Sequence, residues 1–252
     1  MPIRVTIWHE YRHEKKHEHI RAIYPNGMHA VLGDALKKDP NLSVRLTTLD
    51  DPQHGLTDEI LDNTDVFIWW GHGHHGEVED ERVTELQKRI LNGVGLIVLH
   101  SGHHSKIFKR LMGTTANLKW RVGTPPDREI LWVTKPGHPI TAGIDDHFVL
   151  AEEEMYGEYF DVPEPMETLL ISSFTGGEVF RSGMTWTRGA GKIFYFRPGH
   201  ETFRTLYNAD YQRIVQNAVY WAAPVAGGKV PPAAPHSKAG WIDERLAAAA
   251  AK

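Results

Sequence analysis

Apolar and amphipathic segments alternate along the first 115 residues of the chain. Short apolar segments rich in β-branched and aromatic residues predict buried strands at 3–10, 42–50, 65–71 and 95–102. Between them, apolar positions recur at helical spacing over 27–39, 57–63 and 79–93, with Thr57 as a candidate N-cap and Gly93 as a candidate stop. Strands and helices in turn, joined by short connections, predict an α/β fold with an open, mostly parallel sheet and helices on both faces.

The pattern is less regular after residue 115. Extended segments punctuated by Gly and Pro run to about residue 200, and the last of them, "KIFYFRPGHE", is an apolar strand that ends in a histidine. Residues 209–223 predict a closing amphipathic helix, and from Pro224 the composition is that of an extended linker followed by an Ala-rich helix. We expect one α/β domain over 1–223 and a Pro/Ala-rich tail over 224–252. The tail is expected to dock on its own domain or on a neighbouring subunit of a homo-oligomer.

Composition narrows the function classes. The formal net charge is −4 with no basic block, which argues against a nucleic-acid or anionic-membrane partner. No apolar run is long enough to span a bilayer, and the first residues lack the order of a signal peptide, so we expect a cytoplasmic protein. The chain has no cysteine and therefore neither disulfides nor thiolate chemistry. Its 16 histidines are the unusual number.

Histidines follow four of the predicted strands. Because the carboxyl ends of parallel strands meet at one edge of an open sheet, where such folds bind ligands, we expect these side chains to converge there. A single histidine at a strand end is more often a hydrogen-bonded turn residue, but the convergence of four strands favours a site. The candidates are His9, Glu10, His13 and Glu14 after the first strand; His72, His74 and His75; His100, Ser101, His103 and His104; and His200 and Glu201.

Two chemistries would use such a cluster. Three neutral imidazoles, here His72, His103 and His200, would hold a divalent metal with one position left open, most plausibly zinc, with manganese or iron as alternatives. General acid–base catalysis by histidine with an orienting carboxylate is the rival reading. The pairs His13/Glu14 and His200/Glu201 have the right residue types, although neighbours on a strand point to opposite faces.

Ser101 follows a strand and precedes a predicted helix, where a nucleophilic serine would stand. The flanking residues lack both outer glycines of the GxSxG pattern, since Leu99 and His103 occupy their places. The alternative is that Ser101 caps the helix or binds a ligand.

Several segments taken together resemble the ThuA-type trehalose-utilisation proteins over residues 3–223. They are "WWGHGHH", "GLIVLHSGHHSKIFKRLMGTTANLKWR", "HPITAGI", "EEMYGEYF", "GGEVFRSGMTWTRGAGKIFYFRPGHE" and "NAVYWA". The resemblance implies a flavodoxin-like fold of the class I glutamine-amidotransferase type. In those amidotransferases the nucleophile is a cysteine and a late strand supplies a histidine, and the matching positions here are Ser101 and His200. Without a cysteine, glutamine hydrolysis through a thioester is excluded.

The resemblance also implies a role in the catabolism of trehalose-type disaccharides, beside a sugar 3-dehydrogenase that makes 3-keto sugars. A 3-keto group acidifies the proton on C2, so a base can remove it, with elimination, hydrolysis or isomerisation to follow. We predict Glu154 as that base, with a solvated strand-edge carboxylate as the alternative, and assign His13 and Ser101 as further catalytic candidates. The predicted substrate-binding residues are Glu14, His75, Tyr156, Arg181 and Arg197.

Some of these assignments have structural alternatives. Arg181 and Arg197 could equally pair with carboxylates, and Trp69, Trp70 and Trp186 are expected in the core rather than against a sugar. The first-strand segment reads "WHEYRHE" where the resemblance predicts asparagine in place of His9, which favours His13 and Glu14 as the functional pair. Two other functions stay open at this point: a non-catalytic sugar-binding or regulatory module, and a hydrolase that uses Ser101 and His200.

Overall fold

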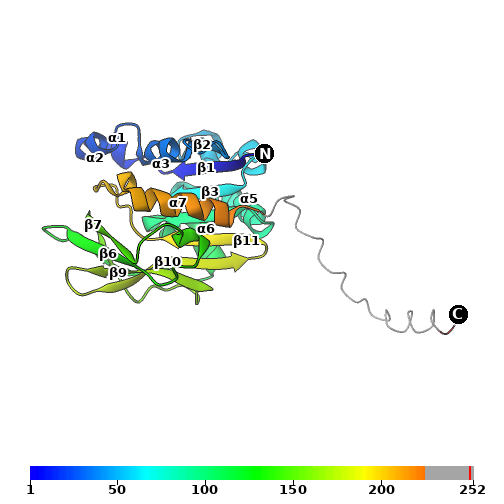
Figure 1. Ribbon diagram of the computed structural model, residues 1–252. Coiled ribbons are helices and arrows are strands. Elements are labelled where there is room, and N and C mark those ends of the chain that lie inside the picture. Colours follow the sequence, from blue (N-terminus) through cyan, green and yellow to red (C-terminus); the bar gives the residue numbers. More distant parts are fainter. Residues whose placement is uncertain (225–249, 251–252) are drawn as a thin grey trace.

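The computed structural model describes residues 1–224 and residue 250 (Figure 1). The tail predicted over 224–252 lies outside these residues, apart from residues 224 and 250. Among the described helices, none combines the length and the apolar character needed to cross a membrane.

A nine-stranded sheet organises the chain. One half is parallel and consists of β2 (Leu42–Thr48), β1 (Ile3–His9), β3 (Val66–Trp70), β4 (Gly95–Leu99) and β11 (Gly191–Phe196), in that order. The other half continues from β11 in antiparallel pairings through β10 (Val179–Arg188), β9 (Glu167–Phe174), β6 (Asp127–Val133) and β7 (His147–Glu153). The predicted α/β fold is confirmed, and parallel pairing holds for its N-terminal half and β11.

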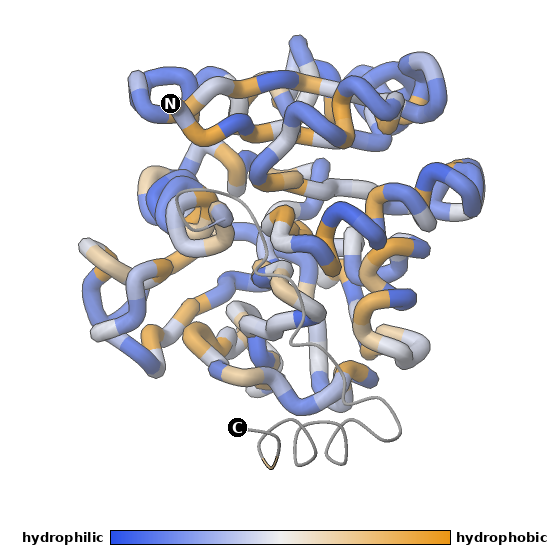
Figure 2. Tube along the Cα trace, turned by 90° about the vertical axis from the view of Figure 1, so that its right-hand side faces the viewer, coloured by the Kyte–Doolittle hydropathy of each residue, from blue (hydrophilic) through white to orange (hydrophobic). Residues whose placement is uncertain are grey.

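Helices cover both faces of the parallel half, as predicted. α3 (Met28–Leu36) and α7 (Ala209–Ala222) pack on one face, together with α2 (Glu18–Ile23). α4 (Asp58–Asp62), α5 (Asp80–Leu91) and α6 (Lys106–Met112) pack on the other. The strands explain this layering, because Val5 and Ile7 join one apolar cluster while Trp8 joins the other. Figure 2 shows hydrophobic and hydrophilic positions alternating along the same elements.

The remaining elements are short. They are α1 (His13–Lys16), the 3₁₀ turns η1 (Pro52–Gly55), η2 (His75–Glu77), η3 (His100–His104), η4 (Pro139–Thr141) and η5 (Thr205–Tyr207), and a separate two-stranded sheet of β5 (Lys119–Arg121) and β8 (Met155–Gly157). Thr57 accepts a hydrogen bond from the Ile60 N–H and caps α4, as predicted. The helix after β4 is capped by Ser105 and not by Ser101, because the η3 turn separates them.

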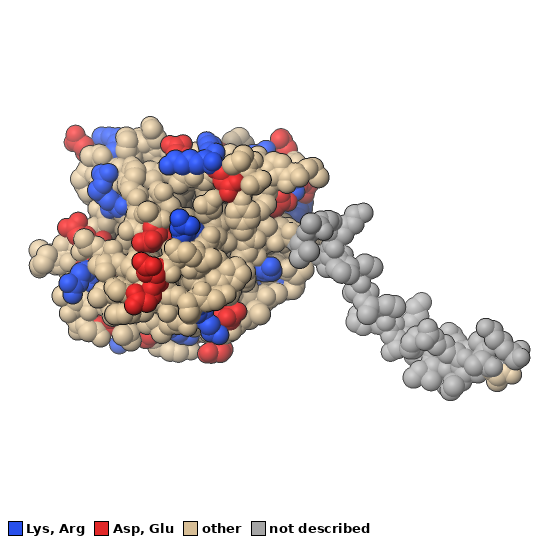
Figure 3. Space-filling view, viewed as in Figure 1, with Lys and Arg blue, Asp and Glu red and all other residues tan. Residues whose placement is uncertain are grey.

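Trp69, Trp70 and Trp186 are buried in the core, as expected, and Trp69 stacks on Trp8 with ring centroids 3.8 Å apart. On the face shown in Figure 3, Lys and Arg side chains lie scattered among Asp and Glu and form no large basic patch.

Candidate active site

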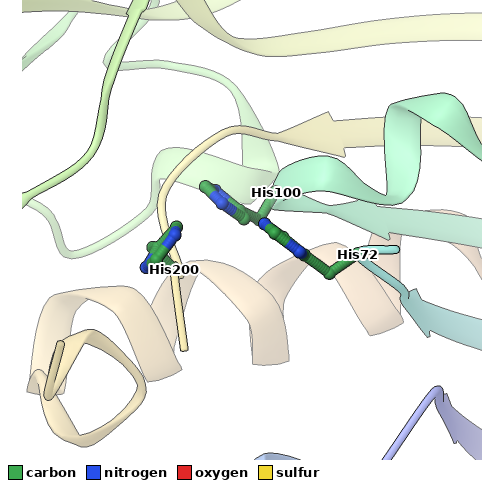
Figure 4. A group of neighbouring side chains, drawn as sticks. All are labelled: His72, His100 and His200. Atoms are coloured by element: carbon green, nitrogen blue, oxygen red, sulfur yellow. The ribbon is translucent and has the colours of Figure 1, made fainter. Parts of the chain in front are cut away.

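Three histidines meet at the carboxyl ends of the parallel strands (Figure 4). His72 follows β3, His100 follows β4 and His200 comes four residues after β11, and one ring nitrogen of each lies within 4.8 Å of the others. This confirms the predicted convergence, but with His100 in the position expected for His103. His103 instead turns to the side, where its Nδ1 lies 2.7 Å from the Ala116 carbonyl oxygen and its ring contacts Phe160.

His100 has a backbone conformation that side chains rarely adopt. Its φ is +48°, in the left-handed region, directly after the buried strand β4. Such residues are retained where the surroundings force them, often at functional sites. His100, and not Ser101, therefore occupies the sharp turn that a nucleophile takes in related α/β folds.

The hydrogen bonds of His100 fix its tautomer. Nδ1 lies 3.0 Å from the Arg197 carbonyl oxygen, which can only accept, so Nδ1 carries the proton. The free Nε2 faces the Glu154 Oε2 at 3.1 Å and the Tyr156 hydroxyl at 3.3 Å. Burial, together with the Arg197 charge, places the pKa of His100 well below its ordinary value, so this imidazole is neutral.

Glu154 lies buried between two of the histidines. Its Oε1 is 3.9 Å from the His200 Nε2, while its Oε2 approaches His100. Burial raises the pKa of Glu154, and the nearby His200, His72 and Arg197 only partly offset that rise. The solvated alternative for this carboxylate is therefore wrong, and Glu154 is poised to hold or take up a proton.

A fully buried carboxylate, Glu10, fixes the loop that carries His72. It accepts backbone hydrogen bonds from His72 at 2.7 Å, His74 at 2.9 Å and Gly73 at 3.2 Å. Burial alone would raise the pKa of Glu10, but these three N–H groups outweigh it and the pKa lies below its ordinary value. Glu10 is thus an ionised anchor for the loop.

A second fully buried carboxylate, Glu153, fixes the loop that carries His200. It accepts hydrogen bonds from the backbone of Gly199 at 2.8 Å and His200 at 3.2 Å, and from the Thr205 hydroxyl at 2.8 Å. Each of the two loops therefore carries one site histidine, and one buried glutamate, Glu10 or Glu153, accepts hydrogen bonds from its backbone.

A second group of potential ligands adjoins the first. His13, His72 and Glu201 each place a ligand atom within 4.8 Å of the others, and the His13 Nδ1 lies 3.4 Å from the Glu201 Oε1. Burial raises the pKa of Glu201 to about 8, and burial lowers that of His13 to about 4. His13 is thus paired across the site with Glu201. Its sequence neighbour Glu14 instead accepts from the Met28 N–H at 2.9 Å, at the start of α3.

A cavity of about 280 Å³ opens above this cluster. It is lined by His72, Ser101, His103, His104, Trp120, Val122, Glu154, Tyr156 and His200. The Ser101 Oγ is buried and has no hydrogen-bond partner, so no base is in contact with it. The predicted residues Glu154, Ser101, Tyr156, His72, His103 and His200 thus share one cavity.

Five predicted residues lie outside the cavity lining: His13, which pairs with Glu201 as described above, and the four that follow. Arg197 is completely buried, where its guanidinium bonds Glu129, and Arg181 pairs with Glu158 at 2.9 Å; both follow the structural alternative. His75 packs against His104 with ring centroids 6.2 Å apart, and Glu14, in α1, accepts a hydrogen bond from the first residue of α3. A buried arginine that pairs with a carboxylate has a structural role and is not available to bind a sugar. The residue type alone does not distinguish these two roles.

The sequence pattern gives little signal for Glu153 and Trp120, and it marks Glu10 as a strand-end candidate without a role. Glu153 stands beside Glu154 in an acidic run, and only the pairing of β7 turns its side chain toward the His200 loop. The prediction noted His100 and Glu201 among the strand-end residues but assigned them no role.

The family model of ThuA, described as trehalose utilisation, matches residues 4–222. No curated protein matches the chain.

Solved structures share the fold at low sequence identity. A ThuA-like protein from Parabacteroides merdae is 16% identical with a TM-score of 0.65, over 93% of this chain and 94% of that one. A ThuA-like protein from Bacteroides uniformis is 16% identical with a TM-score of 0.62, over 87% and 91%. A cytoplasmic protein from Salmonella typhimurium is 11% identical with a TM-score of 0.61, over 88% and 99%. Each likeness covers nearly the whole of both chains and concerns the fold.

Proposed function

Because the chain belongs to the ThuA family of trehalose utilisation, we propose that it is a cytoplasmic enzyme of trehalose-type disaccharide catabolism that acts on a 3-keto sugar. The keto sugar has to be supplied by a sugar 3-dehydrogenase, since oxidation at C3 must precede chemistry at C2. Glutamine amidotransfer through a thioester is excluded, because the chain has no cysteine.

The observation that carries the proposal is the buried Glu154 carboxyl on the cavity lining, between His100 and His200. In its ionised form Glu154 accepts the C2 proton of the 3-keto sugar, and the C–H electron pair becomes the double bond of an enediolate. Return of that proton to the neighbouring carbon or to C2 gives an isomer or an epimer. Expulsion of the C1 substituent with its electron pair gives elimination, and water then completes hydrolysis.

The donor set fits a divalent metal, and we propose zinc, with manganese or iron as alternatives, held by His72, His100 and His200. Neutral imidazole is the ligating form, and burial lowers the pKa of all three histidines, that of His200 to about 3. His100 also donates its Nδ1–H to a backbone carbonyl, which is the outer contact that orients a metal-binding histidine. A metal bound there would polarise the 3-keto group and stabilise the oxyanion that develops on it.

Two further side chains on the cavity lining have groups suited to sugar hydroxyls. The Tyr156 hydroxyl donates toward His100, and the Ser101 Oγ is buried on the lining with no hydrogen-bond partner among the described residues. We assign both to substrate binding. His13 and Glu201, which pair on the other side of His72, are the groups available for a second proton transfer.

The test is a C2–H exchange assay with 3-keto-trehalose in D₂O, followed by NMR, for wild type, Glu154→Gln and Glu152→Gln. Glu152 is the exposed neighbour and serves as the matched control. Removing a general base lowers the rate by about 10²–10⁴-fold. We expect such a loss in Glu154→Gln alone. An unchanged rate in that variant would assign proton abstraction to another residue.

Metal content is measured on the same preparations by elemental mass spectrometry. About one ion per chain, lost in His100→Ala and retained in His103→Ala, supports the ligand set proposed here. The opposite pattern would favour His103.

The other two functions predict different outcomes. A sugar-binding module would bind 3-keto-trehalose without exchange in any variant, and a Ser101/His200 hydrolase would lose its activity in Ser101→Ala. If chelation unfolded the protein, the metal would be structural rather than catalytic.

A further inference from the structure

A tryptophan at the mouth of the cavity is left open to solvent. Trp120 is 63% exposed and Val122, two residues later, is 49% exposed, yet both line the same cavity as Glu154 and His200. Large apolar side chains are usually buried, so an exposed aromatic face at the rim of a cavity that also holds histidines and a carboxyl fits a ligand with both apolar and polar surface.

The strand that carries Trp120 is firmly held. β5 pairs antiparallel with β8, and Trp120 lies directly opposite Tyr156. Paired residues of an antiparallel ladder share a face, so Trp120 and Tyr156 project to the same side, toward the cavity. Arg121, between Trp120 and Val122, projects to the other side, where it bonds Asp127 and, at 2.8 Å, Glu178. The ion pairs of Arg121 thus hold the strand on one side, while Trp120 and Val122 face the cavity on the other.

The size of the cavity limits what it can enclose. About 280 Å³ lies at the lower end of the roughly 300–1,000 Å³ typical of sites for larger ligands. One sugar ring placed with its reacting carbon at Glu154 would occupy this space. The second ring of a disaccharide would then lie at the mouth, where Trp120 and Val122 are exposed.

We propose that Trp120, supported by Val122, is the platform on which the second ring of the disaccharide substrate stacks. This inference rests on the proposed function and names its substrate class as a disaccharide rather than a single sugar. A pyranose ring has hydroxyls on its edge and C–H groups on its faces. The exposed indole can cover such an apolar face while the hydroxyls stay in water.

The inference is tested by binding, so that it does not depend on turnover. Isothermal titration in the Glu154→Gln background compares 3-keto-trehalose with 3-keto-glucose, because that background does not consume the ligand. The variants are Trp120→Ala, Trp120→Phe and, as a matched control, Trp132→Ala. Trp132 is a partly exposed tryptophan on β6 that does not line the cavity.

Loss of an aromatic stacking contact corresponds to about a tenfold weaker dissociation constant. We expect Trp120→Ala to weaken 3-keto-trehalose binding by about that factor and 3-keto-glucose binding by less than about twofold. Trp120→Phe is expected to retain most of the affinity, and Trp132→Ala to match the parent for both sugars.

Equal losses for both sugars would place Trp120 at the reacting ring, and no loss for either would leave it out of recognition; each result overturns the platform. Failure of the proposed function looks different. In that case the parent protein binds neither keto sugar, and wild type gives no C2–H exchange.

Discussion

The loops that carry His72 and His200 are each held by a buried glutamate that accepts backbone hydrogen bonds, but the charged groups next to the two glutamates differ. Glu10 accepts three backbone N–H groups of the His72 loop, and its ion-pair neighbour is His13 at 3.8 Å. Glu153 also accepts backbone N–H groups of the His200 loop, but it lies 3.9 Å from Arg197, whose charge is already bound by Glu129.

The pKa values of the two carboxyls consequently shift in opposite directions, although burial acts to raise both. The backbone N–H groups bring the pKa of Glu10 below its ordinary value despite its burial. For Glu153, burial raises the pKa by more than Arg197 and the hydrogen bonds lower it, and burial raises the pKa of Glu129 to about 7. Neither the number of hydrogen bonds nor a nearby guanidinium therefore decides the charge of a buried anchor by itself; the cost of burial has to be outweighed. Glutamine, which has the shape of a protonated carboxyl, distinguishes the two cases.

The largest effect is expected for Glu10→Gln. The amide removes the negative charge that accepts hydrogen bonds from three backbone N–H groups of the His72 loop. It also places its own N–H₂ group, a donor, opposite at least one of these N–H groups. Hydrogen bonds to a charged group contribute about 1.5–3 kcal/mol each, and we expect a loss of about 3 kcal/mol in the free energy of unfolding. Urea denaturation at neutral pH measures it, with the exposed Glu18→Gln as control. A loss no larger than that of the control would show that Glu10 does not hold its loop.

Glu153→Gln is expected to cost less, about 1–2 kcal/mol. The carboxyl of Glu153 keeps a proton more readily than that of Glu10, so the neutral amide replaces a group of similar charge. Arg197 also retains Glu129 as its partner. The same denaturation series measures it, with the exposed neighbour Glu152→Gln as control. A loss equal to that of Glu10→Gln would mean that Glu153 is ionised and would remove the contrast between the loops.

The parallel half of the fold could be predicted from the sequence with little error. The strand predicted at 95–102 is β4 (Gly95–Leu99), and the helix predicted at 209–223 is α7 (Ala209–Ala222). β4 is apolar throughout because all of its residues are buried within the sheet, and α7 shows helical periodicity because one of its faces packs on the sheet. For the antiparallel half the sequence predicts extended segments but not their order in the sheet, because strand order depends on contacts between residues far apart in the sequence.

The location of the candidate site could be predicted from the sequence, but the arrangement of its side chains could not. The sequence located the strand ends correctly, yet His100 and His103 are both histidines beyond the same strand. Spacing does not tell which of them joins His72 and His200, and in the structure it is His100, at the left-handed turn. Likewise, Arg197 has the residue type of a sugar ligand, and only its full burial against Glu129 shows that it belongs to the fold. Such choices depend on side-chain direction and burial, which residue spacing does not encode.

The pH dependence of the two glutamine variants is expected to run in opposite directions. A carboxyl with a lowered folded-state pKa stabilises above its unfolded value of 4.5, and this contribution is lost as the pH falls through the folded pKa. The deficit of Glu10→Gln should therefore shrink toward acid pH. A carboxyl with a raised folded-state pKa stabilises in its protonated form, and this contribution is lost as the pH rises above 4.5. The deficit of Glu153→Gln should therefore shrink toward alkaline pH.

Urea denaturation of wild type and both variants between pH 3.5 and about 8 measures the two opposite trends. Parallel curves for the two variants would show that both anchors carry the same charge in the folded protein. The control pair Glu18→Gln and Glu152→Gln should stay level with wild type throughout.

The smallest effect concerns the ring of His200 rather than its loop. The His200 Nδ1 lies 2.7 Å from the Thr202 hydroxyl, whereas the contact of the His72 ring with a carboxylate is its Nε2 at 3.9 Å from Glu201. Thr202→Val removes the hydroxyl with little change in shape. An outer hydrogen bond to a ligating histidine contributes about tenfold in metal affinity, and a neutral hydrogen bond contributes about 1 kcal/mol to stability. We expect losses of that size in Thr202→Val, measured by metal titration and urea denaturation, and near wild-type values in Thr202→Ser, which keeps the hydroxyl. If both variants bound metal like wild type, the Thr202 hydroxyl would not orient the His200 ring, and the backbone N–H of Thr202, which donates to Nδ1 at 3.3 Å, would suffice.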